Sequence, residues 1–210
     1  MEYPLRGFLL GINPGVDQDN LKLALDHSAG ALLTQSYLVT ESIPEALPDL
    51  RSQIHEKIIV LDTRLDYPAP EELATLSLMR EIDVVTVIGT YGQEPIRRIM
   101  KGTNLSLYSI IDIGTQEFRT NYSVSHLAAF AKTAKESLCR GVVMTALFPD
   151  RISTVRNVVG NDFEIVASSH PSCSPGDGIR AGANLEILPF EFWSGREEID
   201  LIRLKGKLGL

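Results

Sequence analysis

The stretch GVVMTALFPDRISTVRNVVGNDFEIVA (141–167) decides the fold, because it contains two short apolar runs around a longer amphipathic segment. The runs 141–145 and 164–167 are rich in β-branched residues and have the length of strands. Residues 149–159 between them have the spacing of polar and apolar positions that is typical of a helix. A strand, a helix and a second strand in this order predict two parallel strands joined by a crossover helix.

The same alternation extends along the whole chain. Strands are expected at 7–12, 30–34, 57–61, 84–88, 105–112, 141–145, 164–167 and 185–188, and helices near 17–27, 44–54, 70–81, 93–101, 123–137, 149–159, 175–182 and 194–203. Most of these strands are continuous apolar runs, as in parallel sheets that are covered on both faces. We therefore predict an α/β protein with one (β/α)8 TIM barrel domain over residues 1–210, with a doubly wound open sheet as the alternative.

The composition is that of an ordinary globular protein, with 44% hydrophobic and 22% charged residues. A net charge of -7 argues against a nucleic-acid partner, because phosphate backbones are bound by clustered Lys and Arg. The N-terminal apolar run is too short for a signal peptide or a membrane span, which predicts a cytoplasmic protein without a membrane partner. Cys139 and Cys173 are far apart and fit no metal or redox spacing, so we expect reduced thiols.

In such a barrel the functional residues lie at the carboxyl ends of the strands. Asn13 and Gln35 follow the first two strands, and Asp62, Arg64 and Asp66 follow the third. Alternation along an extended chain would place these three charges on one face, where they either grip a ligand or form a structural ion cluster. Arginine keeps its proton throughout the physiological range, so Arg64 would act by charge and not as an acid.

The loop after the seventh strand contains a second group of candidates. Ser174-Pro175-Gly176-Asp177 has the pattern of a capped helix start, and the backbone N–H groups there, including those near Gly178, can hold a phosphate. Against this, Asp177 would repel an anion. Ser169 and His170 precede this turn in a loop rich in hydroxyl groups. His170 is the histidine expected to titrate usefully near neutrality, with a surface residue of no catalytic role as the alternative.

Several motifs resemble the orotidine 5'-phosphate decarboxylase family. SPGDGIRAGANLEIL (174–188), preceded by FPDRISTVRNVVGNDFEIVASS (148–169), resembles the last third of these enzymes. DVVTVIGTYGQEPIRRIM (83–100) is similar to their fourth strand and the turn after it, and VLDTRLDYP (60–68) lies where they have a charged D-x-K-x-x-D motif.

The resemblance implies a TIM barrel, a homodimer with shared active sites and a carboxy-lyase of pyrimidine metabolism. It also implies that a phosphorylated ligand is held by the loops after the seventh and eighth strands, with no metal or organic cofactor. The sequence departs from the family at the reacting residues. Arg64 stands in place of the lysine, the motif is one residue shorter, and Asn13 stands in place of an aspartate. A second lysine and the eighth-strand arginine of the family fall near Leu33 and Phe190.

The lysines provide an independent test of the chemistry. None of the seven falls at the carboxyl end of a predicted strand, which excludes a proton-donating or Schiff-base lysine at the barrel mouth. They are Lys22, Lys57, Lys101, Lys132, Lys135, Lys205 and Lys207.

Three hypotheses remain at this point. The first is a divergent member of the decarboxylase superfamily that binds a phosphorylated small molecule, a nucleotide or sugar phosphate. Its candidate catalytic residues are Asp62, Arg64, Asp66 and His170, and its candidate ligand-binding residues are Asn13, Gln35, Ser169, Ser174, Gly176 and Gly178. The second is a non-catalytic binding or assembly module whose mouth is filled by Leu33, Phe190 and Trp193. The third is an isomerase or aldolase-like barrel that uses His170 with a carboxylate.

Overall fold

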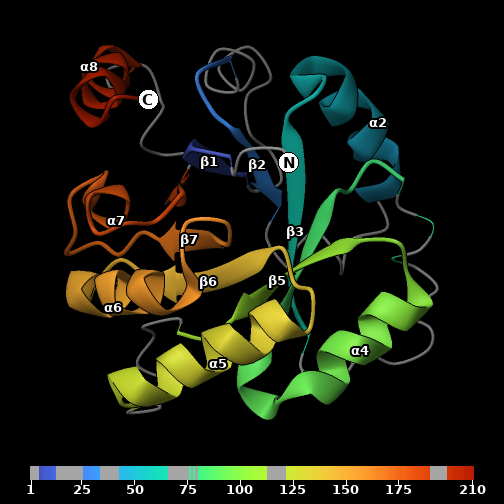
Figure 1. The fold of residues 1–210 in the computed structure, drawn as a ribbon. Coiled ribbons are helices and arrows are strands. Elements are labelled where there is room, and N and C mark those ends of the chain that lie inside the picture. The colour runs from blue at the N-terminus through green and yellow to red at the C-terminus, as the bar shows by residue number, and fades with distance from the viewer. Residues whose placement is uncertain are drawn as a thin grey trace.

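The computed structural model describes residues 5–12, 26–33, 43–65, 76, 78, 80–112, 122–189 and 198–210. Eight parallel strands close into a barrel in the order of the sequence (Figure 1). Strand β1 pairs with both β2 and β8, because Leu9 lies opposite Gly30 on one side and Ile187 on the other. The predicted (β/α)8 barrel is confirmed, and the doubly wound open sheet is wrong.

The strands lie where the apolar runs predict them. They are β1 (Gly7–Ile12), β2 (Gly30–Leu33), β3 (Ile58–Leu65), β4 (Val84–Ile88), β5 (Ser106–Ile110), β6 (Gly141–Thr145), β7 (Glu164–Ser168) and β8 (Leu185–Pro189). Strand β3 is the main exception, since it continues four residues beyond its predicted end at residue 61 and includes Asp62 and Arg64. These two residues are therefore part of the strand and not of the loop that follows it.

The helices surround the barrel, with α5 and α6 packed side by side (Figure 1). Their bounds are α2 (Ile43–Ile54), α4 (Gln93–Gly102), α5 (Val124–Glu136), α6 (Pro149–Val159), α7 (Asp177–Arg180) and α8 (Glu198–Leu208), with a 3-10 turn η2 (Gly89–Tyr91). The helices predicted near 17–27 and 70–81 lie mostly outside the described residues. Helix α7 is much shorter than the predicted 175–182, because Gly176 has a left-handed φ of 90° and the helix begins only after it.

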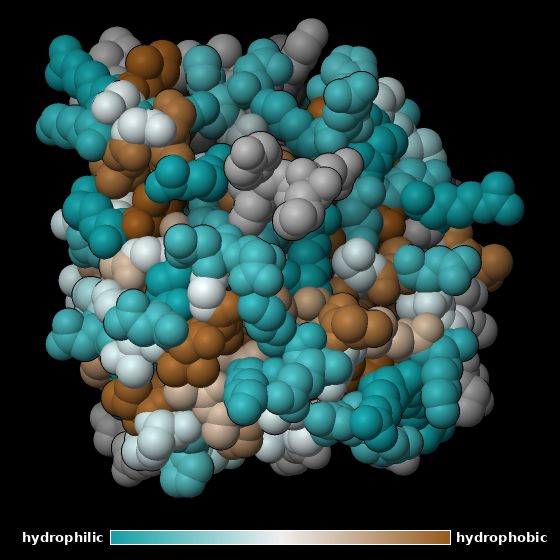
Figure 2. Space-filling model, viewed as in Figure 1, coloured by the Kyte–Doolittle hydropathy of each residue, from teal (hydrophilic) through white to brown (hydrophobic). Residues whose placement is uncertain are grey.

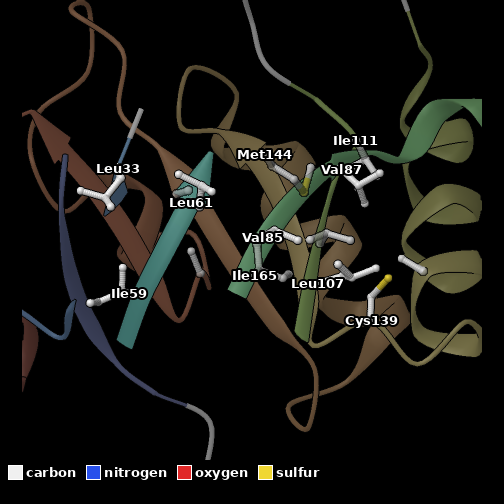
Figure 3. Close-up of a cluster of buried hydrophobic side chains, with 14 of the residues drawn as sticks. Leu33, Ile59, Leu61, Val85, Val87, Leu107, Ile111, Cys139, Met144 and Ile165 are labelled. Carbon is white, nitrogen blue, oxygen red and sulfur yellow. The ribbon is translucent and has the colours of Figure 1, made fainter. Parts of the chain in front are cut away.

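Alternate residues of the strands pack in two separate layers. The outer layer, between strands and helices, joins strand residues such as Ile59, Val85 and Met144 to helix residues such as Ile96 and Leu127. Figure 3 shows part of this layer, including Leu33 and Leu61. The inner layer fills the barrel with Leu9, Val60, Val84, Tyr108, Ile110, Val143, Val166 and Leu185. The barrel is thus a packed core in its middle, and only its two ends are open to polar residues.

The amino-terminal end of the barrel is closed by a polar group that we call the floor cluster: Tyr108, Arg140, Glu164 and the Leu5 N–H. The buried Glu164 carboxylate accepts hydrogen bonds from Tyr108 Oη at 2.5 Å, Arg140 Nε at 2.8 Å and the Leu5 N–H at 3.1 Å. Burial and the nearby Glu164 charge raise the pKa of Tyr108 well above its ordinary value. The buried charge of Glu164 is therefore compensated by hydrogen bonds within the floor cluster.

The face shown in Figure 2 carries small hydrophobic patches separated by hydrophilic side chains. In the described part of the chain no helix is both long and apolar enough to cross a membrane. Cys139 and Cys173 are both free thiols, as predicted. Burial raises the pKa of Cys139 to about 12, so this thiol is unreactive near neutrality.

Candidate functional site

The carboxyl end of the barrel has a regular ring of polar residues. On β3, β4, β6 and β7, and just beyond the end of β5, a residue of the inner apolar layer is followed two positions later by a carboxylate or a hydroxyl side chain. We call these five residues the mouth layer: Asp62, Thr86, Asp112, Thr145 and Ser168. Because side chains alternate along a strand, the spacing of two directs them toward the same interior as the apolar residues below.

Asp62 and Thr86 form the most enclosed pair of the mouth layer. Thr86 Oγ1 donates a hydrogen bond of 2.7 Å to Asp62 Oδ1, and only 8% of Asp62 is exposed. A carboxylate this buried needs fixed hydrogen-bond partners, and the hydroxyl from the neighbouring strand supplies one. Asp62 is therefore a fixed residue of the barrel interior and not the solvated end of a strand.

An irregularity in β3 sets the position of this pair. Between Leu61 and Leu65 strand β3 advances four residues, while β4 advances only two, from Val85 to Val87. Thr63 Oγ1 donates a hydrogen bond to the Thr86 carbonyl within this bulge. The bulge begins directly after Leu61, and the prediction that Asp62, Arg64 and Asp66 share one face stays a prediction. Arg64 lies on the bulged strand, and Asp66 lies outside the described residues.

Asp112 forms an ion pair at the rim of the mouth. Arg151, on the first turn of α6, donates from Nη1 to Asp112 Oδ2 at 3.0 Å. The same guanidinium lies 4.2 Å above the ring centroid of Phe148, whose side chain is 39% exposed. The ion pair and the cation–π contact together fix Arg151 at the rim of the carboxyl end of the barrel.

His170 lies in the loop after β7, half-buried. Its Nδ1 accepts a 3.1 Å hydrogen bond from the Ser172 N–H, and its carbonyl accepts one from the Cys173 N–H at 2.8 Å. An accepting Nδ1 leaves Nε2 as the N–H donor of a neutral ring. Within the described residues the imidazole makes no hydrogen bond to a carboxylate, which the isomerase or aldolase hypothesis needs.

The predicted phosphate-binding turn has its backbone donors in use. Ser174 N–H donates to Asp177 Oδ2 at 2.8 Å, and Gly176 N–H donates to Glu186 Oε1 at 2.8 Å. The prediction that Ser174 caps the helix is wrong, because Gly176 is the N-cap and Ser174 lies two residues earlier. Ser169 N–H also has an acceptor, the Ile187 carbonyl at 3.3 Å. A ligand at this loop would therefore meet side chains before it met free amides.

Glu186 was not predicted, although the sequence contains a signal for it. It is fully buried on β8 and lies beside Gly178, whose own Cβ, if present, would lie 3.0 Å from Glu186 Oε2. Glu186 precedes Leu188 by two residues and so shares the helix-facing side of the strand. An acidic residue on that apolar side requires a buried hydrogen-bond partner. The alternation of side chains along the strand would have indicated such a residue from the sequence. Thr86 was missed for the opposite reason, since a threonine inside a β-branched run is typical of an ordinary strand.

Of the remaining predicted residues, some lie outside the described part of the chain and others have a described position. Asn13 and Gln35 lie outside the described residues, as do Phe190 and Trp193. Leu33 packs in the outer layer and not in the mouth (Figure 3), so it does not fill the barrel opening. Six of the seven lysines are described, and each lies on a helix or, for Lys57, before a strand; only Lys22 is outside the described residues. Among the described residues no group of His, Cys, Asp and Glu is suited to a metal ion.

Comparison with solved structures identifies the architecture. Orotidine 5'-monophosphate decarboxylase from Metallosphaera sedula matches with a TM-score of 0.76 and 14% identity over 97% of this chain and 100% of that one. The enzyme from Methanocaldococcus jannaschii, complexed with the inhibitor BMP, matches with a TM-score of 0.76 and 10% identity over 98% and 100%. The chain has the orotidine 5'-phosphate decarboxylase fold. The predicted resemblance is thereby confirmed for the fold of this decarboxylase-like barrel.

A third similar structure is an uncharacterized conserved protein from Geobacillus kaustophilus, with a TM-score of 0.69 and 15% identity over 96% of this chain and 99% of that one. The sequence of this chain matches no protein-family model and no curated protein sequence. At these identities the comparison shows the shared fold alone, and a site and its chemistry must be argued from the residues themselves.

Proposed function

We propose that this barrel binds a phosphorylated, hydroxylated small molecule, a nucleotide or sugar phosphate, at its carboxyl end. The observation that carries the proposal is the mouth layer, in which four strands and the segment just after β5 each add a polar residue above an apolar core. Five polar side chains at one end of a packed barrel are costly to keep for stability alone. Their position is also the one where barrels of this class bind their ligands.

The mouth layer suits the hydroxyl groups of a sugar. The two carboxylates, Asp62 and Asp112, accept hydrogen bonds, and the three hydroxyls of Thr86, Thr145 and Ser168 can donate or accept. A ribose or a related sugar presents the complementary set of donors and acceptors. The hydrogen bond from Thr86 gives the Asp62 carboxylate a fixed direction for such a ligand.

The phosphate is assigned to the rim. Arg151 uses one nitrogen for Asp112, which leaves further guanidinium N–H groups for an anion. Arg64, on β3 two residues after Asp62, remains the predicted second positive charge for the phosphate. The hydroxyls of Ser169 and Ser174, together with His170, supply neutral donors from the β7–α7 loop. Asn13 and Gln35 remain predicted ligand residues on the first two loops.

Carboxy-lyase activity by the lysine mechanism is a weaker part of the proposal. The described residues contain no lysine at the mouth, and Lys22 alone lies outside them. Arginine cannot take over as a proton donor, because its pKa is too high. We therefore propose binding as the primary function, with Asp62, Arg64, Asp66 and His170 as the residues that would act in any reaction. The homodimer and the cytoplasmic location stay predictions.

Thermal-shift titration tests the proposal with orotidine and uridine monophosphates, ribose 5-phosphate, uridine and inorganic phosphate. At 100-fold excess over Kd a bound ligand stabilises the fold by about 2.7 kcal/mol. We expect a shift with a phosphorylated ligand and a smaller one with uridine. The Arg64→Ala variant should lose most of the phosphate-dependent part. No shift with any of the phosphorylated compounds would reject the proposal, and a shift without release of carbon dioxide from orotidine monophosphate would favour a binding role.

A non-catalytic assembly module is the second candidate. Its prediction that Leu33 fills the mouth does not agree with the outward position of Leu33. It gains support only if the barrel proves to bind none of these compounds.

A further inference from the structure

Glu186 is a buried charge that the proposed ligand site does not use. It lies on β8 with 0% exposure, on the helix-facing side of the barrel and beneath α7. A carboxylate in this position is costly unless hydrogen bonds replace the water that it has lost. Its partners therefore indicate what it does.

The partners of Glu186 are backbone amides at the start of α7. Gly176 N–H donates to Oε1 at 2.8 Å, and Ile179 N–H donates to Oε2 at 3.2 Å. Burial raises the pKa of Glu186, while the hydrogen bonds from Gly176, Ile179 and Gly178 oppose that rise. Arg180, the nearest basic residue on this helix, is hydrogen-bonded to Asp177 at 2.6 Å. Peptide N–H groups, and not a cation, compensate this carboxylate.

Two glycines shape the space that the carboxylate occupies. A Cβ on Gly178 would lie 2.2 Å from Ala167 Cβ and 3.0 Å from Glu186 Oε2, so any larger residue would displace the carboxylate or the strand beneath it. Gly176 has a φ of 90°, a conformation that directs its N–H toward Oε1 and that side chains disfavour. The binding of Glu186 thus depends on a specific backbone path between residues 174 and 179.

The same backbone path carries the loop side chains of the proposed site. Residues 169–176 leave the end of β7 and return to the barrel at Gly176, where Glu186 holds the chain. Ser169 and His170 lie at the other end of this short loop, next to Ser168 of the mouth layer. Fixing the end at Gly176 therefore restricts the conformations of the whole segment.

We propose that Glu186 is a positioning residue, whose buried carboxylate fixes the β7–α7 loop from behind and takes the place of a ligand anion at the start of α7. A ligand phosphate is then held by the side chains of the loop and rim, and not by the amides of Gly176, Gly178 and Ile179. The first part of this inference stands independently of any ligand. The last part rests on the proposed function.

Anion rescue tests the first part. Glu186→Ala leaves three amides without an acceptor and a space the size of a small carboxylate, so its melting temperature should fall by several degrees. Formate or acetate should restore about half of that loss by binding in the space, while chloride at equal ionic strength should restore little. Leu188→Ala is the matched control, because it opens a space on the same face of the same strand without freeing an amide. Equal responses of the two variants to formate, or no response, would overturn the inference.

Glu186→Gln provides a second test if the alanine variant does not fold. It keeps the volume but places an amide donor opposite a backbone donor. Hydrogen exchange should accelerate at least about tenfold at Gly176, Gly178 and Ile179, and remain unchanged at Val143 on the far side of the barrel. Uniform exchange, unchanged at the loop amides, would contradict the positioning role.

Affinity for the best phosphorylated compound of the screen addresses the last part separately. It should fall about tenfold in Glu186→Gln and stay unchanged in Leu188→Ala, because only the first variant alters the loop. If wild type binds none of the compounds, the proposed function fails, while the rescue and exchange results still decide the role of Glu186. Equal affinity in Glu186→Gln and wild type would show that the loop position does not matter for the ligand.

Discussion

The two ends of the barrel interior both contain carboxylates with little exposure, but the hydrogen-bond partners of these carboxylates differ. At the floor, Glu164 is bonded by a tyrosine, an arginine and a backbone N–H. At the mouth, Asp62 is held by the Thr86 hydroxyl and Asp112 by a single nitrogen of Arg151. We infer that the floor carboxylate serves stability, because its hydrogen-bond partners bind it at both oxygens, and we propose that the mouth carboxylates also meet a ligand. The two ends of the barrel therefore offer a direct test of which buried charges are structural and which bind a ligand.

The largest effect is expected at the floor. Glu164→Ala removes the common acceptor of the floor cluster and leaves the Arg140 guanidinium half-buried without its partner. The free energy of unfolding should fall by about 3–5 kcal/mol, measured by urea denaturation. Glu136→Ala is the matched control, since it breaks the exposed Lys132–Glu136 pair at 3.9 Å and should cost less than about 0.5 kcal/mol. A similar cost for both variants would show that the floor cluster is not special.

The next effect should appear at the mouth and in binding. Asp62→Ala removes the most enclosed acceptor of the mouth layer, so affinity for the phosphorylated ligand should fall about 10- to 100-fold in calorimetric titration. Stability should change less than in Glu164→Ala, because the hydrogen bond lost at Thr86 comes from a neutral hydroxyl and not from a guanidinium. Affinity equal to wild type would show that Asp62, like Glu164, has a structural role and does not bind the ligand.

A third prediction concerns alkaline pH. The folded state holds the pKa of Tyr108 well above its ordinary value of 10.0, so the folded protein keeps a proton that the unfolded chain loses. Stability should therefore be full below pH 10 and decline as the pH rises above that value. Tyr108→Phe should cost about 1.5 kcal/mol at neutral pH and remove this part of the decline. An identical decline in both proteins would contradict the assignment.

The smallest effect is expected for Thr86→Val, which keeps the shape of the side chain and removes the donor to Asp62 Oδ1. Stability should change by about 1 kcal/mol or less, and ligand affinity should fall a few-fold because Asp62 loses its fixed direction. Thr103→Val, at a buried threonine bonded to the Ile99 carbonyl in α4, serves as a control that should leave affinity unchanged.

Much of this fold follows from local pattern. The β-branched runs of β4 and β6 predict strands because continuous apolar runs fit a sheet that is covered on both faces. The bulge in β3 could not be predicted, since the register between Leu61 and Leu65 depends on which residues of β4 lie opposite. The short α7 likewise depends on a contact distant in sequence, between Gly176 and Glu186.

The candidate site was predictable in its position and less so in its residues. The rule that functional residues lie at the carboxyl ends of the strands indicated Asp62, because the charge follows an apolar run directly, and the structure places Asp62 near that end of β3. Thr86 became significant only once β3 and β4 were adjacent and its hydroxyl met Asp62. A search for inner apolar residues followed two positions later by a polar one would have indicated the whole mouth layer from the sequence.

The most direct test of the central claim is an NMR titration with uridine monophosphate that follows the backbone amides of both ends of the barrel at once. The account predicts shifts at Thr86, Thr145 and Ser168 of the mouth layer, and none at Tyr108, Arg140 and Glu164 of the floor cluster. Shifts confined to the floor, or none at either end at saturating ligand, would contradict it.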